Sequence, residues 1–345
     1  MATLKEREVR LRNWNKALLA DIAVIIVLTG LAYLPRIHEL NYYRDDWYYM
    51  ADGYSGGPAA FHEMFWIDRP ARGYVFDLLF RAFGLSPLPY HITAFAWRLL
   101  SGLAALWLFR LIWPSNHRAA LWGSLLFALF PGYLWWVSGI EYQPMILSAL
   151  FETVSIALTV MAVRATGRPA RLVLWSASIA TGWFYLLMVD YAIGMEVFRY
   201  LCVYLVVRSQ DPSTSKPRIL VRSFRSWLPA SLVGLAFLGW RLLVFANHRE
   251  ATDVGIQLGS LWAEPVQTGL WWLVRLIQST TNEVAFAWAV PLSRWLFGLS
   301  LAEIVTGLAL ALAALGILAV DRALRHAVTH AGGGKGLAPA GASIP

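Results

Sequence analysis

The sequence has few charged residues: Asp, Glu, Lys and Arg make up 14% of its 345 residues. Soluble domains carry roughly 25% charged residues, so this chain has too few charges to cover a surface that faces water. Apolar side chains make up 58% of it, and runs of about 20 apolar residues recur along its length. Because backbone polar groups must be paired inside a bilayer, such runs predict helices. The composition therefore indicates an all-α polytopic membrane protein.

Cysteine is almost absent, and the single Cys202 lies within an apolar run. A disulfide within the chain and a CxxC metal site are therefore excluded. His62 and His91 occur without a metal-binding spacing such as HExxH, so structural roles are expected for both. No internal repeat of the kind found in many transporters is visible.

Eight spans are predicted from the apolar runs, at about 17–35, 88–113, 118–140, 143–163, 171–190, 192–207, 225–246 and 298–320. Most of the 29 Lys and Arg lie in the N-terminal tail, in alternate connections and in the C-terminal tail. The positive-inside rule then places both termini in the cytoplasm, and most acidic residues on the extracytoplasmic face of an inner or plasma membrane. This distribution accounts for the net charge of +8 without a nucleic-acid partner.

Two predicted external segments are longer than ordinary loops. The first, about 36–88, is expected to contain a short helix at 44–52, ended by a breaker cluster that begins at Gly53. A second helix is expected at 71–83, where apolar residues share one face and an Asp77–Arg81 pair lies on the other. Both helices are expected at the membrane interface.

The second long segment, about 247–297, is either an interfacial helix pair or a re-entrant element. We therefore expect a core module at 1–246 and an external or interfacial segment with the last span at 247–330. The small-residue tail at 331–345 is expected to be disordered.

An acidic pair follows the first predicted span directly, in the stretch 42-YYRDDWYYMADGY-54. Adjacent carboxylates repel each other, which raises one pKa and suits a proton acceptor or a ligand for a divalent metal. A solvated acidic loop is the alternative interpretation of Asp45 and Asp46. No other feature of the sequence indicates a cofactor.

A family resemblance rests on three short motifs: Asp45-Asp46 followed by Tyr49, then Arg69-Pro70, then Phe83-Gly84 at the end of the predicted amphipathic helix. In this order after a first span, they resemble the GT-C glycosyltransferases, which include the protein O-mannosyltransferases and the bacterial lipid A aminoarabinose transferases. The resemblance covers about residues 17–246. It implies a GT-C-like bundle of about eight transmembrane helices and a polyprenyl-phosphate-linked sugar as donor.

The resemblance also implies roles for several acidic residues. Asp45 would activate the acceptor, with Asp46 as its neighbour. Glu141 stands where several relatives have a second external acid, although it could instead only close a tight turn. Apart from the resemblance, Trp47 and the tyrosines of this stretch, Tyr49 among them, are expected to anchor the short helix at membrane depth, with stacking of the sugar on an aromatic face as a further role.

A lipid-phosphate donor needs cations at the external surface, because its phosphate gains charge as the glycosidic bond breaks. Arg69 and Arg241 are the candidates, and Arg241 could alternatively extend to the interface without a ligand. Glu196 and Arg199 stand three residues apart on one helical face, and an internal ion pair is expected between them.

The leading hypothesis is a transferase that moves a sugar from a polyprenyl phosphate to a glycan, lipid or protein acceptor on the extracytoplasmic face. A transporter or channel is the second interpretation, although the acids gather in one external loop instead of at the membrane midplane. A non-catalytic membrane scaffold with the same fold is the third.

Overall fold

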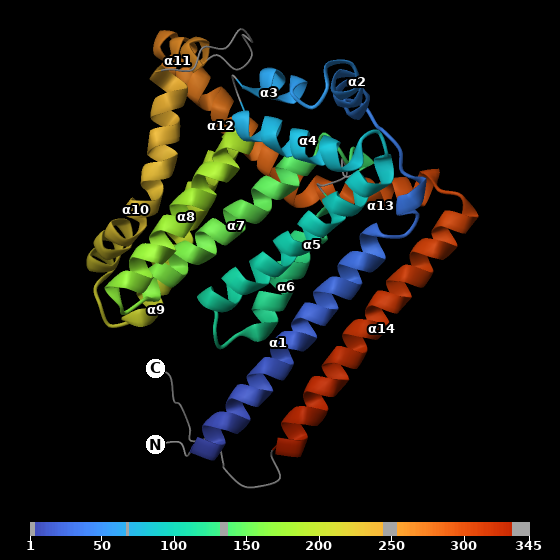
Figure 1. Ribbon diagram of the computed structural model, residues 1–345. Helices are drawn as coiled ribbons and strands as arrows, with labels where there is room; N and C mark the ends of the chain where they lie inside the picture. Colours follow the sequence, from blue (N-terminus) through green and yellow to red (C-terminus); the bar gives the residue numbers. More distant parts are fainter. Residues whose placement is uncertain (1–3, 67–68, 132–136, 244–253, 333–345) are drawn as a thin grey trace. The chain divides into compact units, whose positions relative to one another are not determined.

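The computed structural model describes residues 4–66, 69–131, 137–243 and 254–332, and these form helices and connecting turns with no strand among them. The first half contains α1 (Leu4–Tyr33), η1 (Ile37–Glu39), α2 (Asp46–Gly56), α3 (Ala60–Phe65), α4 (Pro70–Phe83), α5 (Pro87–Ile112), α6 (His117–Ala128) and α7 (Gln143–Arg164). The second half contains α8 (Arg168–Met188), η3 (Asp190–Gly194), α9 (Met195–Gln210), α10 (Lys216–Leu243), α11 (Val254–Ala263), α12 (Pro265–Thr281), η5 (Asn282–Phe286), α13 (Ala287–Gly298) and α14 (Leu301–Gly332) (Figure 1).

Six helices of the described ranges are long and apolar enough to cross a membrane: Lys16–Glu39, Pro87–Ile112, Gln143–Arg164, Arg168–Met188, Lys216–Leu243 and Leu301–Leu324. Each of them overlaps a predicted span. The chain is thus all-α in its described parts, as the composition predicts, and is consistent with a multi-pass membrane protein.

The two other predicted spans correspond to shorter helices. In place of a continuous span at 118–140, α6 has 12 residues and ends at Ala128. Pro131 follows shortly after, and a proline both lacks an N–H and disfavours helix in the residue before it. In place of 192–207, the short helix η3 is followed by α9 of 16 residues.

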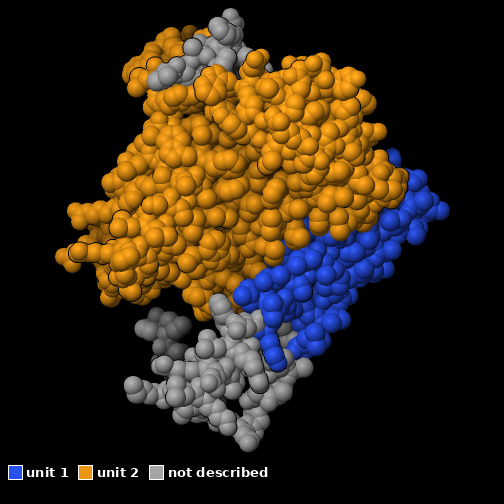
Figure 2. Space-filling model, viewed as in Figure 1, with its two compact units in different colours: residues 1–32, 294–345 blue, residues 33–293 orange. Residues whose placement is uncertain are grey.

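The contacts divide the chain into two units, residues 1–32 with 294–345 and residues 33–293 (Figure 2). The predicted module boundary at residue 246 stays a prediction. The predicted disordered tail lies outside the described residues from 333 onward, whereas residues 331 and 332 end α14.

The first long segment folds into the three short helices α2, α3 and α4, which share a hydrophobic core with the adjacent ends of α5, α7 and α8. Three aromatic rings form its centre: Phe76 stacks on Phe61 at 5.6 Å and on Phe65 at 5.2 Å between ring centroids. The predicted pair also forms, since Arg81 Nε donates to Asp77 Oδ1. These helices therefore have fixed positions within residues 33–293.

The prediction that Gly53 helps to end the first of these helices was wrong, because α2 continues through it to Gly56. A Cβ at position 53 would lie 2.8 Å from ring atoms of both Phe61 and Phe80. Gly53 is therefore required for close ring packing. The helix ends at Gly57, whose φ of 70° only glycine adopts without strain.

The second long segment, where the structure describes it, contains α11, α12, η5 and α13, and none of these is among the six long apolar helices. Most of their apolar side chains are exposed, including Trp271, Trp272 and Ile277 of α12. The choice between an interfacial and a re-entrant arrangement therefore stays open.

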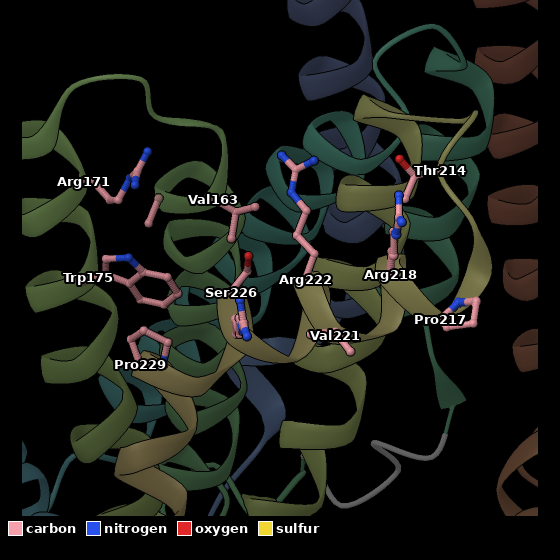
Figure 3. Close-up of a pocket in the computed structure, with 12 residues that line it drawn as sticks. Val163, Arg171, Trp175, Thr214, Pro217, Arg218, Val221, Arg222, Ser226 and Pro229 are labelled. Carbon is pink, nitrogen blue, oxygen red and sulfur yellow. The ribbon is translucent and has the colours of Figure 1, made fainter.

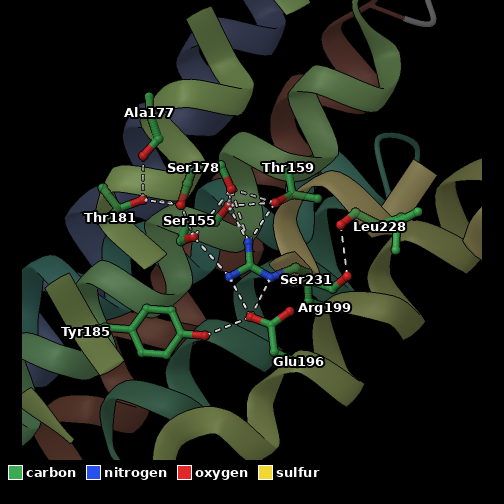
Figure 4. A network of polar contacts seen from close by, with 10 residues as sticks. All are labelled: Ser155, Thr159, Ala177, Ser178, Thr181, Tyr185, Glu196, Arg199, Leu228 and Ser231. Carbon is green, nitrogen blue, oxygen red and sulfur yellow. Dashed lines mark hydrogen bonds and ion pairs between the residues drawn. The ribbon is translucent and has the colours of Figure 1, made fainter. Parts of the chain in front are cut away.

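The predicted ion pair between Glu196 and Arg199 is confirmed, with Arg199 Nη2 3.0 Å from Glu196 Oε1 (Figure 4). Arg199 is buried and also donates to hydroxyls of Ser155, Thr159 and Ser178. The Tyr185 hydroxyl donates to the same Glu196 oxygen at 2.8 Å. The network therefore connects α7, α8 and α9, and one Glu196 oxygen, Oε1, accepts from both Arg199 and Tyr185.

Candidate functional site

Asp46 is buried at the start of α2 and accepts three backbone hydrogen bonds. Its Oδ1 accepts from Glu141 N at 2.8 Å and from Ile140 N at 3.3 Å, and its Oδ2 accepts from Tyr43 N at 3.2 Å. Burial raises the pKa of Asp46 to about 6, while these hydrogen bonds act in the opposite direction. The Asp46 carboxylate thus links the loop before α2 to the turn before α7, and this link is a structural role.

Asp45 precedes α2, and its side chain is exposed. Burial raises the pKa of Glu141, and the charges of Asp45 and Asp46 raise it further. Both carboxylates therefore lie near Glu141. Arg44 and Arg72 act in the opposite direction on the same group. The residue before the pair, Arg44, has a φ of 54°, a conformation that is uncommon outside glycine. The structure therefore brings the two predicted external acids together and exposes only one member of the adjacent pair.

Tyr49, one turn into α2, lies within electrostatic reach of the same charges. Its ring packs on Phe76 with 5.1 Å between centroids, which fixes the side chain. Burial and the charge of Glu141 raise the pKa of Tyr49 to about 12, so the phenol stays protonated at neutral pH. The charged side chains that act on it are Glu141, Arg72, Asp45 and Arg69. Tyr49 is therefore influenced by both the acids and the arginines of this region.

The two predicted cations, Arg69 and Arg241, contact the same carboxylate although they are far apart in sequence. Arg69 Nη2 lies 3.5 Å from Asp190 Oδ1, and Arg241 Nη2 lies 3.2 Å from Asp190 Oδ2. Asp190 is the first residue of η3, two residues after the end of α8. Arg69 precedes α4, and Arg241 lies in the last turn of α10. Asp190 therefore joins the start of α4 to the end of α10.

Sequence reasoning missed Asp190 and Arg72 at this position. Arg72 lies one turn after Arg69 in α4, is 3% exposed, and donates from Nε to the Met188 carbonyl at 2.7 Å. An acid that directly follows an apolar run was the available signal for Asp190. Nothing comparable marks Arg72 beyond its spacing from Arg69.

Trp47 differs from the other predicted site residues, because its side chain is 59% exposed and its ring lies edge-on to Tyr42 at 4.9 Å. It thus has the exposure expected of an aromatic anchor at an interface.

The two histidines considered for metal binding have structural partners: His62 Nε2 pairs with Asp77, and His91 Nε2 pairs with the Asn41 carbonyl. Among the described residues, no group of three or more His, Cys, Asp or Glu could hold a metal ion.

No protein-family model, no curated protein and no solved structure matches this chain.

Proposed function

We propose that the chain is a membrane glycosyltransferase that moves a sugar from a polyprenyl-phosphate donor to an acceptor on the extracytoplasmic face. One observation carries this proposal: the phenol of Tyr49 is within electrostatic reach of an exposed carboxylate, Asp45, and of the cation Arg69. Arg69 in turn shares Asp190 with Arg241. We assign Asp45 as the base and Arg69 with Arg241 as the pair that binds the phosphate, the two functions that transfer from a lipid phosphate requires.

In the proposed reaction, the Asp45 carboxylate accepts the proton of the acceptor hydroxyl while the hydroxyl oxygen attacks the anomeric carbon. The bond between that carbon and the phosphate oxygen breaks, and its electron pair leaves with the polyprenyl phosphate. Arg69 and Arg241 stabilise the charge that develops on the phosphate, since guanidinium groups bind phosphate oxygens in pairs. Tyr49, as a protonated phenol, donates a hydrogen bond to the sugar.

The proposal includes eight crossings, because the contacts place the first residues of α7 and the last residues of α8 and α10 at the same end of the bundle. Asp46 binds the turn before α7, Arg72 binds the carbonyl of Met188, and Arg241 binds Asp190. For α7 to begin there and α8 to end there, we infer that α6 is one further crossing and that η3 with α9 is another. At about 1.5 Å per residue, α9 and η3 together are long enough for this.

A comparison of cell-envelope glycans and lipids by mass spectrometry tests the function. Deletion of the gene is expected to remove one sugar from an envelope component and to cause a polyprenyl-phosphate sugar to accumulate. Wild-type protein restores the product. Asp45→Asn, which keeps the size of the side chain and removes its charge, is expected to restore almost none, since loss of a general base costs roughly 10²–10⁴-fold in rate.

Asp52→Asn serves as the matched control, because Asp52 lies in the same helix and is half-buried, and its charge does not act on Tyr49. It is expected to restore the product fully at equal protein level. Full restoration by Asp45→Asn would contradict the proposed role of this carboxylate, and unchanged envelope glycans and polyprenyl phosphates after deletion would contradict the proposed function as a whole.

A further inference from the structure

A second group of cations lines a cavity of about 910 Å³ between the end of α7, the start of α8 and the first half of α10 (Figure 3). Four arginines contribute to its wall: Arg171, Arg218, Arg222 and Arg225. The predicted catalytic cluster lies at the opposite end of α7, whose 22 residues extend about 33 Å. The two groups of charges are therefore separate sites.

The arginines of α10 are spaced so that their side chains share one face of the helix. Arg218, Arg222 and Arg225 stand at positions i, i+4 and i+7, which lie above one another along a helix. Arg171 faces them from α8, and its Nη2 donates to the Ala165 carbonyl at 2.8 Å, which fixes the guanidinium beside the cavity. Four like charges repel one another, so an anion bound among them would stabilise this arrangement.

Among the described residues that line the cavity there is no acid. Asp211 acts electrostatically on Arg222 from an exposed position, and it makes its own hydrogen bonds to Ser213 and Thr214. The hydroxyl groups of Thr214 and Ser226 also line the cavity. Because the Thr214 hydroxyl donates to Asp211, the guanidinium groups and the Ser226 hydroxyl are the candidate donors to phosphate oxygens in this cavity.

The rest of the wall is apolar and continues along helices that are long enough to span a membrane. Val163 of α7, Trp175 of α8 and Val221 of α10 contribute to it, and all three helices are among the six candidate spans. A ligand with a phosphate group and an attached apolar chain matches both parts of the wall.

We propose that this cavity binds a phosphate group, and that its apolar wall selects a phosphate carried by an anionic membrane lipid over a soluble phosphoester. By the positive-inside rule this end of the bundle is cytoplasmic, so the lipid comes from the cytoplasmic leaflet. The site is independent of the proposed transferase chemistry at the other end of α7.

Thermal unfolding of the full chain in an uncharged detergent tests this proposal with three probes. Short-chain phosphatidic acid carries the phosphate and two acyl chains, glycerol 3-phosphate carries only the phosphate, and short-chain phosphatidylcholine carries the chains without net charge. Phosphatidic acid is expected to raise the unfolding temperature in a saturable way, because a ligand bound to the native state stabilises it. Phosphatidylcholine also carries a phosphate, but its choline group cancels the charge, so it is expected to have a much weaker effect. An equal effect of phosphatidylcholine would overturn the proposed selection for an anionic lipid.

Two triple variants separate this site from general attraction between charges. Arg218→Gln with Arg222→Gln and Arg225→Gln removes three charges of the cavity. Arg118→Gln with Arg208→Gln and Lys216→Gln removes three exposed charges outside it, on the same predicted side. The cavity variant is expected to weaken the apparent affinity for phosphatidic acid at least about tenfold, and the control variant by less than about threefold.

Equal weakening in both triple variants, or no stabilisation of the wild type by either phosphate probe, would overturn the proposal. An equal affinity for glycerol 3-phosphate would overturn the selection by the apolar wall and leave only a site for soluble phosphate. If the cavity variant does not fold, the single variants Arg222→Gln and Arg118→Gln are compared instead. The difference between their apparent affinities for phosphatidic acid is then expected to be smaller.

Discussion

At the scale of single residues, Asp46 is a buried carboxylate held by three backbone N–H groups. Burial nevertheless raises its pKa to about 6 from an ordinary value of 3.8. The native state therefore binds a proton more tightly than the unfolded chain does. It follows that the contribution of Asp46 to stability falls as the pH rises from about 4 to about 6, by about 3 kcal/mol in total.

Asp46→Asn removes this pH dependence, because an amide does not titrate. We expect the unfolding temperature of the variant, measured relative to that of the wild type, to increase between pH 4 and pH 7. At pH 4 the variant is expected to be less stable than the wild type, because the amide nitrogen of Asn cannot accept a backbone hydrogen bond that a carboxyl oxygen of Asp46 accepts. Thermal unfolding in detergent at several pH values measures the difference.

Asp77→Asn is the control, and the pH dependence of its stability relative to wild type is expected to have the opposite sign. The hydrogen bond from Arg81 lowers the pKa of Asp77, so its contribution to stability is lost as the pH falls. Relative to wild type, this variant is therefore expected to be less stable at pH 7 than at pH 4. A pH-independent difference between Asp46→Asn and wild type would contradict the raised pKa of Asp46.

The sequence identified most of the charged residues of the candidate cluster, but not which of them are buried or which contact one another. Asp45 and Asp46 are the same residue type in adjacent positions, and only the turn at Ile140 and Glu141 determines which of them is buried. That turn is almost 100 residues away in sequence. The contact of Arg69 and Arg241 with Asp190 likewise depends on the packing of α4, α8 and α10, which local patterns do not encode.

At the scale of elements, periodicity predicted α4 well, because an apolar face at helical spacing and an Asp77–Arg81 pair are both local signals. Glycine was a poorer signal in α2. Sequence rules treat Gly53 as a breaker, whereas the structure uses its missing Cβ for the approach of Phe61 and Phe80. The same residue type thus ends one helix at Gly57 and allows tight packing one turn earlier.

Gly53→Ala is accordingly expected to destabilise the protein by about 1–3 kcal/mol, because the added methyl overlaps two packed rings. Gly269→Ala in α12 is the matched control, since a Cβ there meets no atom within 4 Å. Alanine at that position is expected to be neutral or to stabilise the helix by up to about 1 kcal/mol. Thermal unfolding midpoints in one detergent compare the two, and equal effects would contradict the packing role of Gly53.

At the scale of the whole molecule, the six long apolar helices and the eight proposed crossings make different predictions for two loops. Both arrangements leave the two termini on the same side, so a reporter at the C-terminus does not separate them. If α6 and α9 do not cross, the connection at Gly167 is external and Tyr191 is cytoplasmic. If both cross, the positions are reversed, and the group around Asp190 lies on the same side as Asp45.

Single cysteines at these two positions decide between the arrangements. Tyr191 is 63% exposed, and a Cβ at Gly167 meets no atom within 4 Å, so both positions accept a reactive thiol. Cys202 is buried and is replaced by Ser in both variants. With a membrane-impermeant thiol reagent added to intact cells, Tyr191→Cys is expected to react and Gly167→Cys to react only after the membrane is opened. The reverse result would mean that the chain crosses six times, and it would separate Asp190 from Arg69 and Arg241 by the width of the bilayer, in conflict with the contacts of Asp190 with both arginines.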